Sequence, residues 1–472
     1  MYQTPNYKIK YMVLLVVAST LFSCFSKQIK HERKPNILFI LVDDLGWSDT
    51  GFMGSPVYET PNLDKLAIQS VVFSNGYAPA ANCAPSRACI LTGKNTPRHG
   101  IYTVGSSERG KTKDRKLVPT INTETLNESF VTLAEVLKNN GYTTGTIGKW
   151  HLSDNPLTQG FDVNIAGSHA GHPKSYFSPY KNSVLEDGED GEYLTDRLTE
   201  EAVRFISHNK ETPFFLYLPY FTVHTPLQGK EALVKKYRAK LKGDDRFNAK
   251  YGAMVESMDE NVGKLLNKLD ELGISDNTLV IFSSDNGGLA SVSSQFPIRA
   301  GKGSYYEGGI RVPFVVRWPN EIQNARIDST AVSGLDIFPT VLDIINEDNN
   351  YNLDGASILS LLTENKPLKE RSLFWHFPIY LQSVNPEKEQ ARDSLFRTRP
   401  GSAMRKGKWK LHEYFEDGEI ELYNLETDIR EHNNLFDEYP EKVKELYDEL
   451  QAWRAKTNAP VPTTLNPNYN LN

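Results

Sequence analysis

The sequence predicts an α/β fold in which a mixed, mostly parallel β-sheet lies between layers of helices. Two apolar runs, at 36–42 and 278–284, contain no charged residue, as expected of strands that are buried on both faces. Helical patterns alternate with apolar runs as far as about residue 345, and such alternation is typical of parallel sheets. The chain of 472 residues is long enough for one large α/β domain and a smaller appendage.

The spacing of apolar residues predicts the individual elements. Helices are expected over 132–140 and 194–206, and a longer one around 254–269, because apolar residues recur there at helical spacing. Short strands over 142–147 and 214–218 follow the first two helices.

Near residue 366 the sequence changes character. Antiparallel strands are predicted at 402–412 and 419–423 around a turn at Glu416-Asp417-Gly418, and a helix over 440–456 packs on them. We therefore expect a main domain over 34–365, followed by a smaller α+β subdomain over 366–472.

The N-terminus resembles an export signal over residues 1–23, with lysines before an apolar run that is too short for a comfortable transmembrane helix. Its end, Leu21-Phe22-Ser23-Cys24, resembles the box at which bacterial lipoproteins are cleaved and lipidated, here at Cys24. Phe22 is unusual in that box, so ordinary signal cleavage is the alternative. We expect an exported protein, periplasmic or an outer-membrane or cell-surface lipoprotein, that meets the membrane only through a lipid anchor.

The net charge of the chain limits the kinds of ligand that are expected. The formal net charge of −6 gives no global basic character, so nucleic acid is not an expected partner. An acidic protein that binds an anion must gather positive charge locally. Three cysteines predict no disulfide framework, and Cys89 reads as a packed thiol.

Two pairs of polar residues follow the two apolar runs. Asp43-Asp44 comes after the first and Asp285-Asn286 after the second. Ligands of open α/β sheets bind outside the carboxyl ends of the strands, so neighbouring strands would bring these four side chains together. Oxygen ligands of this kind suit Ca²⁺ or Mg²⁺ better than zinc. Each pair alone would more often be a turn.

The most informative motif is Cys83-Ala84-Pro85-Ser86-Arg87, which runs on to Leu91-Thr92-Gly93. Pro85 suits the first turn of a helix, which places Cys83 at a helix N-terminus, where an anion is favoured, and Arg87 one turn further on. The alternative is a buried thiol beside a helix start.

This motif resembles the signature of the type I sulfatases, in which the cysteine is oxidised to formylglycine, an aldehyde whose hydrate is the nucleophile. The resemblance covers nearly all of the chain from residue 34 onward. Further blocks that are similar to that family are Lys34-Pro35-Asn36, Asp43-Asp44-Leu45-Gly46-Trp47, Glu59-Thr60-Pro61-Asn62-Leu63-Asp64, Gly148-Lys149-Trp150-His151, Val223-His224-Thr225-Pro226 and Glu421-Leu422-Tyr423-Asn424-Leu425.

The resemblance implies an alkaline-phosphatase-like core and a metal site. Asp43, Asp44, Asp285 and Asn286, together with the modified Cys83, would bind Ca²⁺, with Mg²⁺ the less expected ion. The partner that makes the aldehyde would be a formylglycine-generating enzyme or an anaerobic sulfatase-maturating enzyme.

The resemblance also implies a cationic pocket. Arg87 would hold the aldehyde hydrate and, with Lys149, the sulfate. His151 would be the base that collapses the sulfated intermediate. His224 and Lys302 would contact the bridging oxygen and protonate the departing alcohol. Taken singly, His224 reads as a turn histidine and Lys302 as a solvated loop lysine.

Five residues are candidates for binding the organic part of the substrate. Ser168 corresponds to a further sulfate contact of the family, and His169 and His172 lie near it in a loop that contains Gly and Pro. His376 belongs to an aromatic cluster. Arg399 stands in the segment 396–400, whose guanidinium groups suit sulfate or carboxylate.

The sequence thus predicts a bacterial polysaccharide sulfatase that acts on a sulfated carbohydrate, either an algal glycan such as ulvan or carrageenan or a glycosaminoglycan. One alternative is a phosphodiesterase or phosphonate monoester hydrolase of the same superfamily. The other is a lipoprotein that only binds sulfated glycan and leaves Cys83 unconverted.

Overall fold

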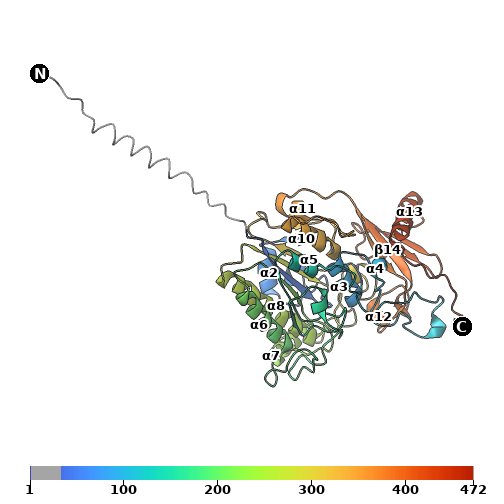
Figure 1. The fold of residues 1–472 in the computed structure, drawn as a ribbon. Helices are drawn as coiled ribbons and strands as arrows, with labels where there is room; N and C mark the ends of the chain where they lie inside the picture. The colour runs from blue at the N-terminus through green and yellow to red at the C-terminus, as the bar shows by residue number, and fades with distance from the viewer. Residues whose placement is uncertain (2–32, 471–472) are drawn as a thin grey trace. The chain divides into compact units, whose positions relative to one another are not determined.

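The computed structural model describes residue 1 and residues 33–470 (Figure 1). The remainder of the predicted export signal, with Cys24, lies outside the described residues. From Pro35 onward the chain groups as one compact unit. The boundary expected between 365 and 366 stays a prediction.

Strands β1 (Asn36–Val42) and β7 (Thr278–Ser284) lie side by side in an eight-stranded sheet. They run parallel, with Asn36 opposite Thr278 and Val42 opposite Ser284, so both strands end at the same edge. Both strands were predicted from the sequence and are confirmed, and the structure shows the adjacency on which the predicted metal site depends.

The sheet has the order β5-β4-β6-β1-β7-β8-β2-β9. Neighbours from β5 to β7 are parallel, β8 is antiparallel to both β7 and β2, and β9 is parallel to β2. This confirms the mixed, mostly parallel sheet. The bounds of the other strands are β2 (Val71–Phe73), β4 (Thr143–Ile147), β5 (Val163–Ile165), β6 (Phe214–Pro219), β8 (Phe314–Arg317) and β9 (Arg326–Asp328).

Alternate residues of β1 enter two different cores, because successive strand residues point to opposite faces. The even-numbered residues from 38 to 42 pack with helices α2, α6, α7 and α8, and the odd-numbered residues from 37 to 41 pack with α3, α5, α10 and α11. Figure 1 shows α6, α7 and α8 on one side and α5, α10 and α11 on the other. These helices are α2 (Pro61–Ala67), α3 (Cys83–Thr92), α5 (Leu133–Asn139), α6 (Leu194–His208), α7 (Glu231–Leu241), α8 (Ala249–Glu271), α10 (Ile337–Ile345) and α11 (Leu359–Glu364).

The predicted helix at 132–140 is α5, and its start is fixed by a capping box. The Thr132 hydroxyl accepts a hydrogen bond from the Glu135 amide, and the Glu135 carboxylate accepts one from the Thr132 amide. The predicted helix at 194–206 is α6, which continues to His208. The shorter elements are α4 (Thr96–His99), α9 (Glu307–Ile310), α12 (Pro386–Glu389), β3 (Gly76–Tyr77), β10 (Val332–Ser333), β12 (Leu381–Gln382) and β13 (Phe396–Thr398).

A four-stranded antiparallel sheet follows, with the order β11-β14-β15-β16, and α13 packs on it. The single strand predicted at 402–412 is wrong, because the chain turns back at Gly407, whose φ of 55° lies in the left-handed region that glycine adopts readily. The turn predicted at 416–418 is present. The bounds are β11 (Ser372–Phe377), β14 (Gly401–Lys406), β15 (Trp409–Tyr414), β16 (Ile420–Asn424) and α13 (Pro440–Thr457).

A buried ion network joins this sheet to α9. The ammonium group of Lys410 lies 2.8 Å from the Glu307 carboxylate and 2.9 Å from the Glu431 carboxylate, and all three side chains are 0% exposed. The Glu307 carboxylate also accepts hydrogen bonds from Tyr77 and Arg311. The network therefore anchors the helix that follows the loop carrying Lys302.

Within residues 33–470, the helices include none with the length and apolar content that a membrane span requires.

Replacing Lys410 by methionine should destabilise the fold by about 3–5 kcal/mol, because the variant leaves two buried carboxylates without their shared cation. The matched control is Lys406→Met, since Lys406 pairs with Glu445 and Glu449 at the surface, where such pairs contribute at most about 1 kcal/mol. Urea unfolding of both variants measures the difference. Equal losses of stability would contradict the buried network.

Candidate active site

The site begins where β1 and β7 end. The Asp44 amide donates to Asp285 Oδ1 over 3.2 Å, and Asn286 Nδ2 donates to Asp44 Oδ1 over 2.8 Å. Asp44 has a φ of 62°, a left-handed conformation that costs a non-glycine residue energy and recurs at functional sites. The structure therefore brings together the polar residues that the sequence placed at two strand ends.

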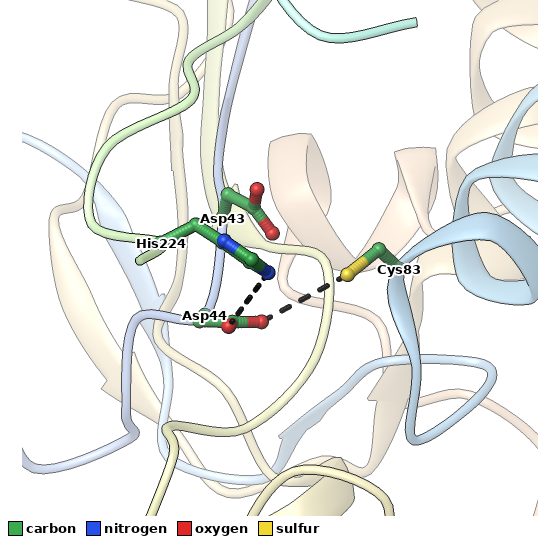
Figure 2. A group of neighbouring side chains, drawn as sticks. All are labelled: Asp43, Asp44, Cys83 and His224. Carbon is green, nitrogen blue, oxygen red and sulfur yellow. Dashed lines mark hydrogen bonds and ion pairs between the residues drawn. The ribbon is translucent and has the colours of Figure 1, made fainter. Parts of the chain in front are cut away.

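Figure 2 shows four side chains that face one another: Asp43, Asp44, Cys83 and His224. One potential ligand atom from each lies within 4.8 Å of the others. Cys83 Sγ is 3.9 Å from Asp44 Oδ1, and His224 Nε2 is 3.6 Å from Asp44 Oδ2. Cys83 is the first residue of α3, so its sulfur stands at the helix N-terminus, as the motif predicts.

The donor set fits a hard divalent cation. Asp43 Oδ1 and Asn286 Oδ1 are buried, and neither has a hydrogen-bond partner in the described part of the chain. A buried acceptor without a partner costs free energy unless a cation or donor satisfies it. Carboxylate and amide oxygens are the ligands that Ca²⁺ and Mg²⁺ prefer. Asp285, also a predicted ligand, is buried, and its Oδ1 accepts a hydrogen bond from the Asp44 amide.

Lys302 contacts both Asp44 and the cysteine. Its ammonium group lies 2.7 Å from Asp44 Oδ1 and donates to Cys83 Sγ over 3.1 Å. It comes from a loop after residue 300, far from both partners in the sequence. The resemblance placed Lys302 in the pocket, and the geometry agrees with that placement.

Two further cations lie behind this group, and both are 0% exposed. Lys149 donates to Asp43 Oδ2 over 2.6 Å. Arg87 lies 2.7 Å from Asp285 Oδ2 and donates to the Lys149 carbonyl over 2.7 Å. Each of the three cations is therefore paired with one acid.

Burial and these partners shift the acids in opposite directions. Burial raises the pKa of Asp43 to about 7, although Lys149 opposes the shift. Burial also acts to raise the pKa of Asp44, but Lys302, His224 and Lys149 together outweigh it and lower that pKa below its usual range. Burial raises the pKa of the Cys83 thiol to about 12, against the pull of Lys149 and Lys302. The unmodified thiol is therefore protonated near neutral pH.

Both histidines of the centre are held neutral. Burial, followed by the charge of Lys302, lowers the pKa of His224 to about 3 despite the nearby Asp44. Burial and the charge of Lys149 lower the pKa of His151 well below its ordinary value. Neutral imidazole can accept a proton, which is the role that the resemblance gives to His151.

The loop after residue 165 surrounds His151. The His151 amide donates to the Ser168 carbonyl over 2.9 Å, so Ser168 meets this histidine through its backbone. The His169 ring lies 6.1 Å from the His151 ring, and the His172 ring stacks on His224 at 6.0 Å with an interplanar angle of 4°. Of the predicted substrate-binding residues, His172 therefore lies against His224 of the active site, while Ser168 and His169 lie beside His151.

A pocket of about 270 Å³ opens on this centre. Its lining includes the predicted residues Asp44, Cys83, His151, His172, His224 and Lys302. It also includes Arg109 and Arg397, which the sequence analysis did not single out. Arg397 belongs to the segment 396–400 that was noted for its guanidinium groups, whereas Arg109 stands in no motif.

His376 and Arg399 do not line this pocket, which corrects their prediction as substrate-binding residues. His376 is 1% exposed, and its two ring nitrogens lie 2.8 Å from Ser402 Oγ and 2.9 Å from the Pro460 carbonyl. Arg399 is paired with Asp393 and Glu416, each at 2.5 Å. The partners of both side chains therefore lie within the C-terminal part of the chain.

Comparison with known proteins places this geometry in a family. Residues 35–347 match the family model described as Sulfatase, and residues 301–456 match the one described as N-sulphoglucosamine sulphohydrolase, C-terminal. A protein from Formosa agariphila named Sulfatase is 32% identical, over 92% of this chain and 92% of its own length. N-acetylgalactosamine-6-sulfatase of Mus musculus is 34% identical over 73% of this chain and 69% of that protein.

Solved structures agree. The structure of Ps i-CgsB in complex with k-i-k-neocarrahexaose has 31% sequence identity and a TM-score of 0.73, and the match covers 89% of this chain and 93% of that one. Phosphonate monoester hydrolase of Agrobacterium radiobacter has 20% identity and a TM-score of 0.65, over 90% of this chain and 96% of that one, a likeness of fold alone. The alkaline-phosphatase-like core is thereby confirmed.

The family model spans the whole region in which β1, α3 and β7 bring the acids, the cysteine and the cations together. With relatives that match across most of its length, the chain belongs to the sulfatase family and is a sulfuric ester hydrolase.

Proposed function

We propose that this protein removes sulfate from a sulfated carbohydrate, using a formylglycine made from Cys83 and a calcium ion beside it. The observation that carries the proposal is the position of Cys83 Sγ, 3.1 Å from the Lys302 ammonium and 3.9 Å from Asp44 Oδ1. A nucleophile there would face both the cation site and a source of positive charge.

The nucleophile has to be made, because a protonated thiol attacks sulfur poorly. A maturation enzyme, which supplies the oxidant, would remove two electrons from the Cys83 side-chain carbon and release the sulfur as sulfide. The aldehyde that remains would add water to give a diol. One diol oxygen attacks sulfur, and the alcohol leaves with a proton. The other hydroxyl then loses its proton, the aldehyde re-forms, and sulfate departs.

The ion would be held by Asp43, Asp44, Asp285 and Asn286 together with the modified Cys83. Bound Ca²⁺ would neutralise sulfate oxygens and lower the pKa of the diol. The two unpartnered oxygens, Asp43 Oδ1 and Asn286 Oδ1, support this assignment. Ca²⁺ is favoured over Mg²⁺ because it tolerates irregular sets of oxygen ligands.

The remaining residues would divide the proton transfers. Arg87 and Lys149 would hold the diol and the sulfate, since their positive charges are buried at the centre. His151 would take the proton from the second hydroxyl. His224 and Lys302, which both face Asp44, would contact the bridging oxygen, and the Lys302 ammonium group would supply the proton to the leaving alcohol.

The substrate is proposed to be a sulfated polysaccharide or its oligosaccharides. A solved relative was crystallised with a neocarrahexaose, and a curated relative is named for N-acetylgalactosamine 6-sulfate. Carrageenan-type glycans and glycosaminoglycans are therefore the first to test, with ulvan next. Export by the N-terminal signal and lipidation at Cys24 belong to the same proposal, since such polymers lie outside the cell.

Cys83→Ala should lower the turnover of 4-nitrophenyl sulfate by about a thousandfold or more, because the variant has no nucleophile. The matched control is Cys89→Ala, which removes a buried thiol of the same helix that contacts His99 instead of the pocket, and which should keep activity. Mass spectrometry of the Cys83 peptide should show the lighter aldehyde. Full activity of Cys83→Ala, or an aryl phosphodiester hydrolysed faster than the aryl sulfate, would contradict the proposal.

The acidic limb of the pH profile of kcat should lie below pH 6.5. Burial lowers the pKa of His151, so the imidazole stays neutral, and able to accept a proton, to lower pH than a free histidine. The profile with 4-nitrophenyl sulfate as substrate measures the limb. A limb at or above pH 6.5 would show that a different group is the base.

Ca²⁺ added to chelator-treated protein should raise the free energy of unfolding by about 2.7 kcal/mol at a hundredfold excess over its Kd. Asp43→Asn should abolish most of this gain. Asp49→Asn is the control, since the Asp49 carboxylate is also buried but is bonded to Tyr251 and Ser293. An equal gain in Asp43→Asn and Asp49→Asn would place the ion elsewhere.

A further inference from the structure

Two arginines in the wall of the active-site pocket have no part in the proposed reaction. Arg109 and Arg397 line the same pocket as Cys83 and Lys302. They come from segments almost 290 positions apart in the sequence. Neither carries a proton to or from the reacting group in the proposed steps.

One residue holds both guanidinium groups. Arg109 Nε donates to Gln382 Oε1 over 3.3 Å, and Arg397 Nε donates to the Gln382 carbonyl over 3.2 Å. Arg397 Nη1 also donates to the Lys302 carbonyl over 3.3 Å. Arg397 is therefore linked directly to the residue whose ammonium group contacts Cys83, and Arg109 is linked to Arg397 through Gln382.

The charge of this pair is only partly balanced. Arg397 has one carboxylate nearby, Glu389 at 3.7 Å. Arg109 is half-buried and donates to neutral oxygens of Gln382 and Val104, and among residues 33–470 no carboxylate lies within 4.0 Å of it. Burial lowers the pKa of Arg397, whereas the charges of Glu389 and Asp44 raise it. The positive charge of Arg109 lowers this pKa further, because the two cations repel each other.

The scissile sulfate does not account for this positive charge. An ester sulfate carries a single negative charge, and Lys149, Arg87 and Lys302 already surround the place where it would react. Within residues 33–470 the hydrogen bonds of both arginines come from Nε and Nη1, so their Nη2 groups keep donors for an anion. Guanidinium groups suit planar or tetrahedral anions, to which they can donate two parallel N–H bonds.

We propose that Arg109 and Arg397 form a second anion subsite, which binds a further sulfate or a carboxylate on the saccharide that carries the scissile sulfate. This inference rests on the proposed function. It makes the enzyme selective for multiply charged saccharides, since an anion between the two arginines relieves their repulsion.

The test measures inhibition constants against 4-nitrophenyl sulfate hydrolysis by the matured protein. One pair of inhibitors is neocarrabiose monosulfate and neocarrabiose disulfate, which differ in one sulfate. The other is an unsaturated chondroitin disaccharide 6-sulfate and its carboxyl-reduced form, which differ in one carboxylate. The wild type should bind the more charged member of at least one pair about tenfold more tightly, the worth of one charge-assisted contact. The pair that shows this preference tells whether the second anion is a sulfate or a carboxylate.

Arg109→Gln should reduce that preference to about twofold, and Arg109→Lys should restore part of it, because lysine keeps the charge but lacks the planar fork. The control is Arg204→Gln, which removes an exposed charge on α6 and should leave the preference and the aryl sulfatase activity unchanged. Loss of affinity for both members of a pair by the same factor in Arg109→Gln would show a merely structural role.

A wild type that hydrolyses the aryl sulfate but shows no preference in either pair would overturn the subsite alone. Absence of aryl sulfate hydrolysis in protein with a converted Cys83 would overturn the proposed function, and the subsite with it.

Discussion

The pairing of three cations with three buried carboxylates is the constraint on which the rest of the site depends. Lys149 with Asp43, Lys302 with Asp44, and Arg87 with Asp285 each join residues from distant parts of the chain. Buried charges are stable only when paired, so the sheet and helices must bring these partners together accurately. Because these pairs form, charged side chains are concentrated beside the N-terminus of α3.

The same arrangement explains how one pocket can serve opposite chemical needs. Oxygens left without hydrogen-bond donors, such as Asp43 Oδ1 and Asn286 Oδ1, favour a cation. The ammonium group of Lys302 and the start of α3 favour an anion a few ångströms away. A sulfate ester, which is an anion that must be neutralised before it is attacked, suits a site that offers both. The antiparallel C-terminal sheet contributes by anchoring α9 through Lys410, and Arg397 reaches the Lys302 carbonyl from the same part of the chain.

Sequence patterns predicted the parts of this structure that depend on residues close together in the sequence, such as strands and strand ends. The apolar runs of β1 and β7 and the polar pairs after them fixed both the central strands and the acids of the site, because strand ends of a parallel sheet meet at one edge. Ion pairs between residues that are distant in the sequence could not be predicted in this way, because no local pattern marks the partner. Arg399 was chosen from the segment 396–400 as the substrate-binding candidate, but Asp393 and Glu416 pair with it, whereas Arg397, two residues earlier, lines the pocket. Arg109 belongs to no motif that would mark it as a pocket residue. The hairpin at Gly407 divides a segment that was predicted as one strand.

The most direct test of the central claim is a crystal structure of the matured protein grown with Ca²⁺. We predict one calcium ion within about 2.3–2.6 Å of Asp43 Oδ1 and Asn286 Oδ1, with the oxidised side chain of residue 83 as a further ligand. An unoccupied cluster, or a calcium ion bound away from residue 83, would contradict the account.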